Sequence, residues 1–451
     1  PTNPTVMRKI NYHEADIVIA GGGPGGCEIA RRFALAGKKA VLVEKGSYSS
    51  RFLGTLAGTL SRLELRPRFS SMPVRSTIEG SAIPLCSGVG GGTLLYCGSA
   101  FLPDRSFWLR HGIDLPQRMI DEAAGETWVS ETPDEFIGPG SRRLMRAALD
   151  MGLPWAPLKR HIDFNRCVPG CDRCTYGCAL GAKWTGLQYI DEAVDSGAMV
   201  LDRCRVRSLL VEQGRCGGLV ATDVLGRIHE VRVPLTVCAA GGIGTARLLR
   251  KAGIPEAGAT FAGDPTGFTF GFLSEGKGNS HEHNMPMGFK DADNGVVFSS
   301  MLAPQIAWFF QVMGDSVKKA PGRIFSYKRA MGLFVKVSDQ DRGAILENGS
   351  ITKTFTARDR ERIRYGRSVN EKILVRAGCD PRSICHTDLT LGHPGQTAPL
   401  GVVVDENLET GISGLYCCDT SVMPEAPGMP PALTVVVLAK YLSGLLLQKN
   451  R

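Results

Sequence analysis

Short apolar runs rich in β-branched residues recur along the chain. The first two are Ala15–Ala20 (ADIVIA) and Ala40–Val43, and a third, Thr236–Ala240 (TVCAA), has the same character. Runs without polar alternation are typical of buried strands in parallel sheets. Residues 27–36 between the first two runs have a helical composition, and Gly37 is placed to end that helix. The pattern predicts an α/β fold that opens with a strand–helix–strand unit.

The first strand runs directly into a glycine-rich turn. Gly21, Gly23 and Gly26 form G-x-G-x-x-G, and Glu44 closes the second strand. In a Rossmann-like unit the first glycine permits the tight turn, the second lets a pyrophosphate approach, and the third lets helix pack on strand. An acid in the position of Glu44 accepts ribose hydroxyls and disfavours a 2′-phosphate. The sequence therefore predicts a dinucleotide site, the alternative being a glycine-rich turn without a ligand.

Two further glycine clusters lie far from the first. Residues 87–93 read SGVGGGT, and residues 241–245 read GGIGT before the helix-like ARLLRKAG. A nicotinamide cofactor does not need three such backbone-exposing segments, whereas a longer ligand lying through the protein does. These clusters favour FAD over NAD.

Composition and charge narrow the class of protein. The chain has 451 residues, enough for two or three domains, and a net charge of +9 without basic runs, which does not indicate nucleic-acid binding. The first residues lack the apolar core of a secretory signal, and no uncharged apolar run reaches the ~18 residues of a membrane span. The longest such run, ALTVVVLA, stops at Lys440. Ten cysteines are scattered without a framework spacing, so we expect a cytoplasmic protein.

Four of the fourteen cysteines crowd into one segment, CVPGCDRCTYGC. Cys167, Cys171, Cys174 and Cys178 have the spacing C-x3-C-x2-C-x3-C, one residue longer in the first gap than a bacterial cluster motif. Zinc sites more often use two CxxC pairs, and only one is present here. The spacing predicts ligands of a [4Fe–4S] or [3Fe–4S] cluster, with zinc or another structural metal, or free or paired thiols, as alternatives.

The segments at 15–44, 88–100, 237–254 and 393–440 resemble glucose–methanol–choline (GMC) oxidoreductases, FAD enzymes that oxidise alcohols. The C-terminal stretch is the most specific, with His-Pro-x-x-Thr, Val-Val-Asp, Asp-x-Ser-x-x-Pro and Pro-Pro-x-Leu-Thr in order. The resemblance implies that the following residues hold FAD: Gly21, Gly23, Gly26, Glu44, Val206, Ala240 and Gly241 at the ADP half, Gly91, Gly92 and Thr93 at the pyrophosphate or flavin edge, and Asp419 and Thr434 at the ribityl and pyrimidine ends. A Gly-Cys-x-x-Gly-Ala-Lys stretch like that around Cys178 also occurs in long-chain alcohol and sterol-oxidising relatives.

The resemblance places His393 at the family's active-site base. An alcohol that loses a hydride to flavin must also lose a proton, and an imidazole suits that task near neutral pH. His386 is the competing histidine. The family's usual second histidine or asparagine is absent, because Pro430 stands there, and Tyr96 replaces a frequent asparagine and is a candidate second donor.

We expect a Rossmann-like FAD-binding domain of GMC type, residues 1–100, 165–260 and 386–451. An interleaved α+β substrate domain, residues 101–164 and 261–385, contains the apolar runs FTFGF (268–272) and MLAPQIAWFFQVM (301–313). The predicted activity is a dehydrogenase that oxidises an apolar, hydroxyl-bearing small molecule. Its electrons leave through the cysteine cluster to an acceptor protein, a partner subunit or a quinone. The alternatives are a flavin-scaffold lyase, isomerase or reductase, prompted by Pro430, and an electron-transfer subunit of a larger complex.

Overall fold

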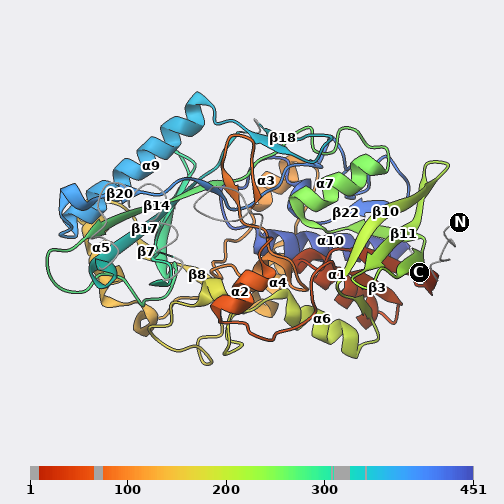
Figure 1. The fold of residues 1–451 in the computed structure, drawn as a ribbon, viewed down its shortest axis with the longest axis horizontal. Helices are drawn as coiled ribbons and strands as arrows, with labels where there is room; N and C mark the ends of the chain where they lie inside the picture. Colours follow the sequence, from red (N-terminus) through yellow and green to blue (C-terminus); the bar gives the residue numbers. More distant parts are fainter. Residues whose placement is uncertain (1–9, 65–74, 306–307, 309–325, 341–342, 450–451) are drawn as a thin grey trace, which may run out of the picture.

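The computed structural model describes residues 10–64, 75–305, 308, 326–340 and 343–449. Two regions lie along the longest axis of the molecule (Figure 1). One end holds the N-terminal strand–helix unit, and the other holds a large, mostly antiparallel sheet. Parts of the run 301–313 lie outside the described residues.

A five-stranded parallel sheet forms the core of the first region. Its order is β22-β13-β2-β3-β9, with bounds Leu415–Cys417, Leu235–Cys238, Ile17–Ala20, Ala40–Val43 and Met199–Leu201. The residues of β2, β3 and β13 are all buried, as the continuous apolar runs predict. Helix α1 (Pro24–Leu35) packs against α6 (Gly186–Asp195) and α10 (Ala432–Lys449), and α7 (Gly241–Lys251) follows β13.

Gly37, with φ of +73°, follows the end of α1, in agreement with the predicted end of this helix.

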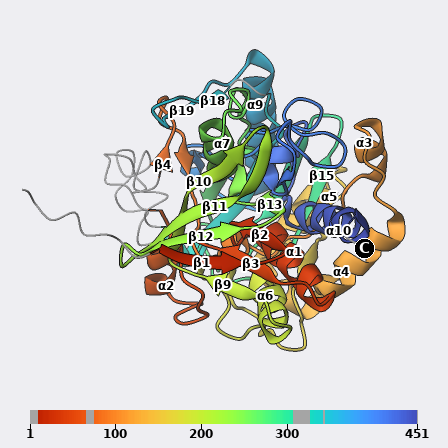
Figure 2. The ribbon, with the colours of Figure 1, turned by 90° about the vertical axis from the view of Figure 1, so that its right-hand side faces the viewer.

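A second, four-stranded sheet lies beside the parallel one (Figure 2). Its order is β1-β12-β11-β10, with bounds Ile10–Glu14, Ile228–Arg232, Arg215–Asp223 and Cys204–Glu212.

The other region is built on a nine-stranded sheet. Eight strands run in the order β4-β5-β21-β14-β17-β16-β15-β7, and β20 pairs with β14 off this path. Their bounds are Arg75–Ser76, Ala82–Ile83, Thr390–Leu391, Pro265–Phe272, Ala330–Val337, Val296–Ser300, Met287–Asp291, Ala156–Pro157 and, for β20, Cys385–His386. The apolar run FTFGF (268–272) lies within β14. Because β4, β5, β20 and β21 belong to this sheet, the sheet draws on segments at both edges of the predicted FAD half.

Helices cover the nine-stranded sheet. The long helix α9 (Ala357–Arg376) packs on β17 and β14, and α5 (Pro139–Leu149) packs on α9. Thr356 and Asp359 form a capping box at the start of α9. The shorter elements are α2 (Leu56–Arg62), α3 (Arg105–Arg110), α4 (Gln117–Glu126), β6 (Val129–Glu131), β8 (Lys159–His161), β18 (Gly343–Ile345), β19 (Ile351–Lys353) and the 3₁₀ turns Gly91–Leu94, Asp134–Phe136, Cys174–Tyr176, Pro381–Ser383 and Thr420–Val422.

Helix α10 is the one described helix long and apolar enough to cross a membrane. Most of it is buried, however, and Lys440 in its middle contacts the carboxylates of Glu28 and Glu126 from α1 and α4. A buried charge network of this kind is typical of a core helix. A buried core helix passes the same test of length and hydropathy as a membrane span.

Candidate active site

The first glycine loop joins β2 to α1. Gly21 has φ of +117°, and a Cβ there would lie 2.3 Å from the Ala239 carbonyl oxygen. A Cβ on Gly26 would lie 2.1 Å from the carbonyl oxygen of Gly21, so only glycine lets the helix approach the strand. At Gly23 the nearest atom to a Cβ is the Ala239 oxygen, at 3.8 Å. The loop is therefore tight at both ends and open at its centre, where a pyrophosphate approaches in this type of turn.

Glu44 ties three backbone segments together at the end of β3. Its carboxylate accepts hydrogen bonds from the backbone N–H groups of Gly22 (2.9 Å), Gly46 (2.8 Å) and Gly88 (3.3 Å). The side chain is buried, so these bonds satisfy a charge that water does not reach freely. A carboxylate has about four acceptor positions, and one remains for a ribose hydroxyl.

The second glycine cluster lies on the first. The Gly90 N–H donates to the Gly22 carbonyl at 2.7 Å, and a Cβ on Gly91 would lie 2.8 Å from the Gly23 Cα. Gly92 has no heavy atom within 4 Å of its Cβ position. Two segments that are distant in sequence thus present open backbone at Gly23 and Gly92 side by side.

Three of the other predicted cofactor residues lie in these loops or on neighbouring elements. Thr93 is buried, and its hydroxyl donates to the Gly90 carbonyl and accepts from the Gly186 N–H. Thr434 is buried in the first turn of α10. Val206 lies in β10, whose first residue, Cys204, donates its N–H to the Glu44 carbonyl.

Asp419 fixes the third glycine cluster. One carboxylate oxygen accepts from the Gly241 N–H (2.8 Å) and the Thr245 hydroxyl (2.6 Å), and the other accepts from the Ser421 N–H. Burial raises the pKa of this carboxyl, and the hydrogen bonds oppose that rise. Asp419 therefore holds the start of α7, with the neighbouring Ala240, against the C-terminal turn. Gly241 itself has no heavy atom near its Cβ position.

His393 lies where the glycine loops meet the nine-stranded sheet. The residue after it, Pro394, sets its carbonyl oxygen 2.2 Å from the Cβ position of Gly242, at the start of α7. The His393 N–H donates to the Gly263 carbonyl, just before β14. The loop therefore belongs to both regions, as the position of a reacting group between cofactor and substrate requires.

Two buried charges face the His393 ring. Its Nδ1 lies 3.2 Å from the Asp264 Oδ2 and also contacts the Lys336 Nζ, while Lys336 and Asp264 form an ion pair at 3.3 Å. Asp264 also accepts from the Gly428 N–H, in the loop that carries Pro430. Nε2 has no hydrogen-bond partner among the residues the structure describes, and the side chain is 24% exposed.

The pKa values of the three groups follow from their burial and mutual charges. Burial, together with the Lys336 ammonium, lowers the pKa of His393 to about 4. Burial also lowers the pKa of Lys336, which Asp264 opposes. Although burial acts to raise it, Lys336 and His393 hold the pKa of Asp264 below its ordinary value. At neutral pH the ring is neutral and the carboxyl is ionised.

The predicted second donor, Tyr96, has another partner. Its hydroxyl donates to the Trp184 carbonyl at 2.8 Å, and its ring lies under the Lys183 ammonium. Burial raises its pKa well above the ordinary value. Tyr96 thus faces the cysteine segment in this structure. The competing histidine, His386, uses both ring nitrogens on the Thr269 hydroxyl and the Glu371 carboxylate.

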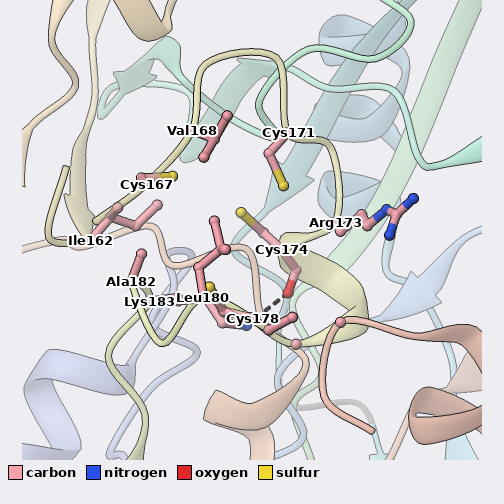
Figure 3. Close-up of a pocket in the computed structure, with 13 residues that line it drawn as sticks. Ile162, Cys167, Val168, Cys171, Arg173, Cys174, Cys178, Leu180, Ala182 and Lys183 are labelled. Carbon is pink, nitrogen blue, oxygen red and sulfur yellow. Dashed lines mark hydrogen bonds between the residues drawn. The ribbon is translucent and has the colours of Figure 1, made fainter. Parts of the chain in front are cut away.

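The four clustered cysteines line one cavity of about 270 Å³, shown in Figure 3. The sulfurs of Cys171 and Cys174 point toward each other, and Cys167 lies across from them. Cys178 completes the lining. No group of three or more His, Cys, Asp or Glu side chains in the described ranges is arranged to hold a metal ion. All fourteen cysteines are free thiols, and burial raises the pKa of Cys167 to about 12.

Two fully buried cations flank this cavity. Lys183 donates to the carbonyls of Leu94, Tyr96 and Cys174, the last of which is drawn as a dashed line in Figure 3. Arg160 donates to the Cys97 carbonyl and lies 3.8 Å from the Cys174 sulfur. No carboxylate of the described residues forms an ion pair with either cation. Because Leu94 and Tyr96 follow the second glycine cluster directly, Lys183 connects the cysteine segment to the predicted flavin edge.

The three converging glycine segments and the carboxylate at the end of β3 fit a long dinucleotide. Open backbone at Gly23, Gly92 and Gly241 could accept its phosphates, with Glu44 at its ribose end. Together with the imidazole between the two regions, these features define a flavin-type oxidoreductase.

Comparisons with known proteins identify the family. The family model of the GMC oxidoreductase N-terminal domain matches residues 15–265, and that of the C-terminal domain matches residues 336–439. The chain belongs to the GMC oxidoreductase family. It is accordingly an FAD-type oxidoreductase that acts on CH–OH groups.

Relatives extend over nearly the whole chain. It is 26% identical to an uncharacterized GMC-type oxidoreductase of Mycobacterium tuberculosis, covering 94% of this chain and 74% of the relative. It is 26% identical to a long-chain-alcohol oxidase of Arabidopsis thaliana, covering 95% of this chain and 66% of that protein. The crystal structure of pyridoxine 4-oxidase from Mesorbium loti matches with a TM-score of 0.70 at 16% identity, covering 96% and 99% of the two chains.

Four charged residues of the site were missed by the sequence reasoning. Asp264 and Lys336 meet His393, and Arg160 and Lys183 meet the cysteines. The sequence offered two local signals. Lys336 interrupts an otherwise apolar strand, and Lys183 follows the cysteine segment. Neither signal identifies the partner, which pairing between distant strands supplies.

Proposed function

We propose that the protein oxidises an apolar, hydroxyl-bearing small molecule to the corresponding carbonyl compound, with His393 as the base that takes the hydroxyl proton. The observation that supports this role is the ring nitrogen Nε2, free of described partners, at the junction of the glycine loops and the nine-stranded sheet. FAD, when bound, supplies the acceptor for the hydride. The chain's own contribution is to orient the hydroxyl and accept its proton.

A buried aromatic cluster in the predicted substrate region favours an apolar substrate. Phe268, Phe270 and Phe334 from β14 and β17 pack with Trp308 in one buried aromatic cluster. Side chains of this kind line pockets for apolar ligands. The likeness to a long-chain-alcohol oxidase points in the same direction.

Anaerobic mixing of the purified holoprotein with alcohols tests this activity. We expect primary alcohols of increasing chain length to bleach the flavin absorbance near 450 nm, with pyridoxine as the polar comparison. A lyase or isomerase on the same scaffold would turn over without bleaching. Absence of bleaching by any aliphatic, sterol or aromatic alcohol would reject the proposal.

We further propose that the electrons leave through an iron–sulfur cluster held by Cys167, Cys171, Cys174 and Cys178. A cluster bound by four thiolates is an anion, and it would compensate Arg160 and Lys183, which otherwise lie buried without carboxylate partners in the described chain. Thiols spread around a cavity also suit a multi-iron group better than zinc, which draws its thiolates to about 2.3 Å from one point.

Iron and acid-labile sulfide in anaerobically purified protein test the cluster. We expect both elements in the wild type and in Cys385→Ser, a control outside the segment, and loss of both in Cys171→Ser. Zinc or four titratable thiols in the wild type would contradict it. With a cluster present, we expect reduction of an acceptor protein or a quinone and little reaction with O₂, in a reducing, cytoplasmic setting. If the isolated chain reduces artificial acceptors with an alcohol as donor, the electron-transfer-subunit alternative fails.

A further inference from the structure

The Lys336 Nζ contacts Nδ1 of His393. When Nε2 of a neutral imidazole acts as a base, Nδ1 is the nitrogen that carries the ring proton. In a neutral imidazole, one nitrogen carries the proton and the other accepts. Because an ammonium has no acceptor, its contact with Nδ1 requires the lone pair there and puts the ring proton on Nε2. In that tautomer Nε2 cannot accept the proton of a substrate hydroxyl.

Asp264 favours the opposite tautomer. Its Oδ2 lies 3.2 Å from the same Nδ1 and can accept a proton from it. The ring therefore carries its proton on Nδ1 when Lys336 is an amine, and on Nε2 when Lys336 is an ammonium. Both side chains that decide this are almost completely buried, with exposures of 2% for Lys336 and 0% for Asp264.

We propose that Lys336 is the final proton acceptor of the oxidation and acts through His393. The cycle begins with Lys336 as an amine, the ring proton on Nδ1 and a free lone pair on Nε2. The substrate O–H bond breaks, an N–H bond forms at Nε2, and the Nδ1 proton moves to the Lys336 Nζ. The product state is a neutral ring with its proton on Nε2 beside an ammonium paired with Asp264, and it keeps the heavy-atom contacts among the three side chains.

Every charge that faces Lys336 is accounted for in the described residues. Asp264 precedes β14, His393 follows β21, and Asp339 follows β17, the strand of Lys336 itself. Asp339 is neutralised by a buried ion pair with Lys353 and accepts from the Asp264 N–H. The cluster therefore keeps one carboxylate, Asp264, for the Lys336–His393 pair, and burial makes the amine form of Lys336 accessible.

Nitrogen NMR of ¹⁵N-histidine-labelled holoprotein tests the tautomer directly, without turnover. At pH 6 we expect the His393 resonances, assigned by their loss in His393→Gln, to show a proton on Nε2 and an unprotonated Nδ1. In Lys336→Met we expect the proton on Nδ1. A proton on Nδ1 in the wild type at pH 6, or the same tautomer in both proteins, would overturn the inference.

The pH profile of anaerobic flavin bleaching supplies the second test, and it rests on the proposed alcohol oxidation. The wild-type rate should rise with pH along one titration, which Lys336→Met should lose. Lys336→Arg keeps the ion pair but cannot give up its proton, so we expect slow bleaching at every pH, at least ~100-fold below the wild type at the upper plateau of the wild-type profile. A Lys336→Arg rate within threefold of the wild type on that plateau, or an unchanged pH midpoint in Lys336→Met, would leave Lys336 only a structural role.

The two tests distinguish a failure of the proposed alcohol oxidation from a failure of the proposed coupling between Lys336 and His393. The expected tautomers without bleaching by any alcohol would reject the proposed function and retain the Lys336–His393 coupling. Bleaching with the opposite tautomer would retain the function and reject the coupling.

Discussion

At the scale of single residues, His393 carries the chemistry that is most directly testable. We expect His393→Ala to slow flavin bleaching by at least ~100-fold, the usual contribution of a positioned base, while FAD stays bound. His386→Ala is the matched control, because that ring is occupied by Thr269 and Glu371. It should stay within about threefold of wild type in the same stopped-flow measurement. Near-normal rates in His393→Ala would move the base elsewhere.

Glu44 supports a second prediction at this scale. Glu44→Ala removes the acceptor of three backbone N–H groups, in Gly22, Gly46 and Gly88. Each buried donor left unsatisfied costs about 1–3 kcal/mol of stability, and both glycine loops lose their common anchor. We expect a lower melting temperature and a lower ratio of 450 to 280 nm absorbance after purification. Glu44→Gln, which keeps an acceptor oxygen, should lose less on both measures, and equal losses would show that hydrogen bonding is not the cause.

Sequence reasoning reached some site residues and missed others for a physical reason. The glycines and Glu44 follow from local spacing, because a strand, a turn and a helix that are continuous in sequence place them. His393 came from resemblance to a family signature. Asp264 and Lys336 meet because β14 and β17 pair in a register that sets Thr266 opposite Lys336. No local pattern contains that information.

At the scale of elements, substitutions in the glycine loops distinguish effects on folding from effects on cofactor binding. Gly26→Ala would put a Cβ 2.1 Å from the Gly21 carbonyl oxygen, so α1 must move off β2. We expect poor expression or a markedly lower melting temperature. Gly92→Ala meets no atom within 4 Å and should leave the melting temperature of the apoprotein unchanged. If the flavin lies there, as we infer, Gly92→Ala should still weaken FAD binding in a fluorescence titration, and unchanged affinity would place the cofactor elsewhere.

Elements with strong local signals were predicted well. The buried strands β2, β3 and β13 and the end of α1 all appear where their patterns indicate. The order of the nine-stranded sheet was not predictable. Several of its strands, such as β4, β5 and β21, are two residues long, too short for periodicity to mark.

At the scale of the whole molecule, the chain passes more than once between its two regions. The nine-stranded sheet takes β5 and β21 from stretches that flank cofactor loops, and β5 pairs with β21 in parallel. The His393 loop follows β21 directly. Because the same segments build the sheet and carry the site, the two regions hold the base between them, and the substrate should reach it from the sheet side.

The buried histidines make the stability of the whole fold depend on pH. Burial lowers the pKa of His161, His283 and His393 to about 4, below the ordinary value of about 6.5. Between these two values the unfolded chain binds protons that the folded chain does not, so stability present above pH 6.5 is lost as the pH falls toward 4. The lowered pKa of Asp264 adds a loss only below about 4, outside this window.

We therefore expect these histidines to contribute proton uptake to urea unfolding of the holoprotein near pH 5. Buried carboxyls whose pKa is raised, such as Asp419, act in the opposite direction, so a single-histidine variant compared with the wild type isolates the contribution of one ring. His161→Gln tests one of the three without touching the base. Its ring bonds the Thr127 carbonyl and lies beside Tyr96 and Trp184, so the variant should be less stable at pH 7 but should show a shallower pH slope, by about one proton. A variant with the wild-type slope would show that the His161 ring is protonated in the folded protein.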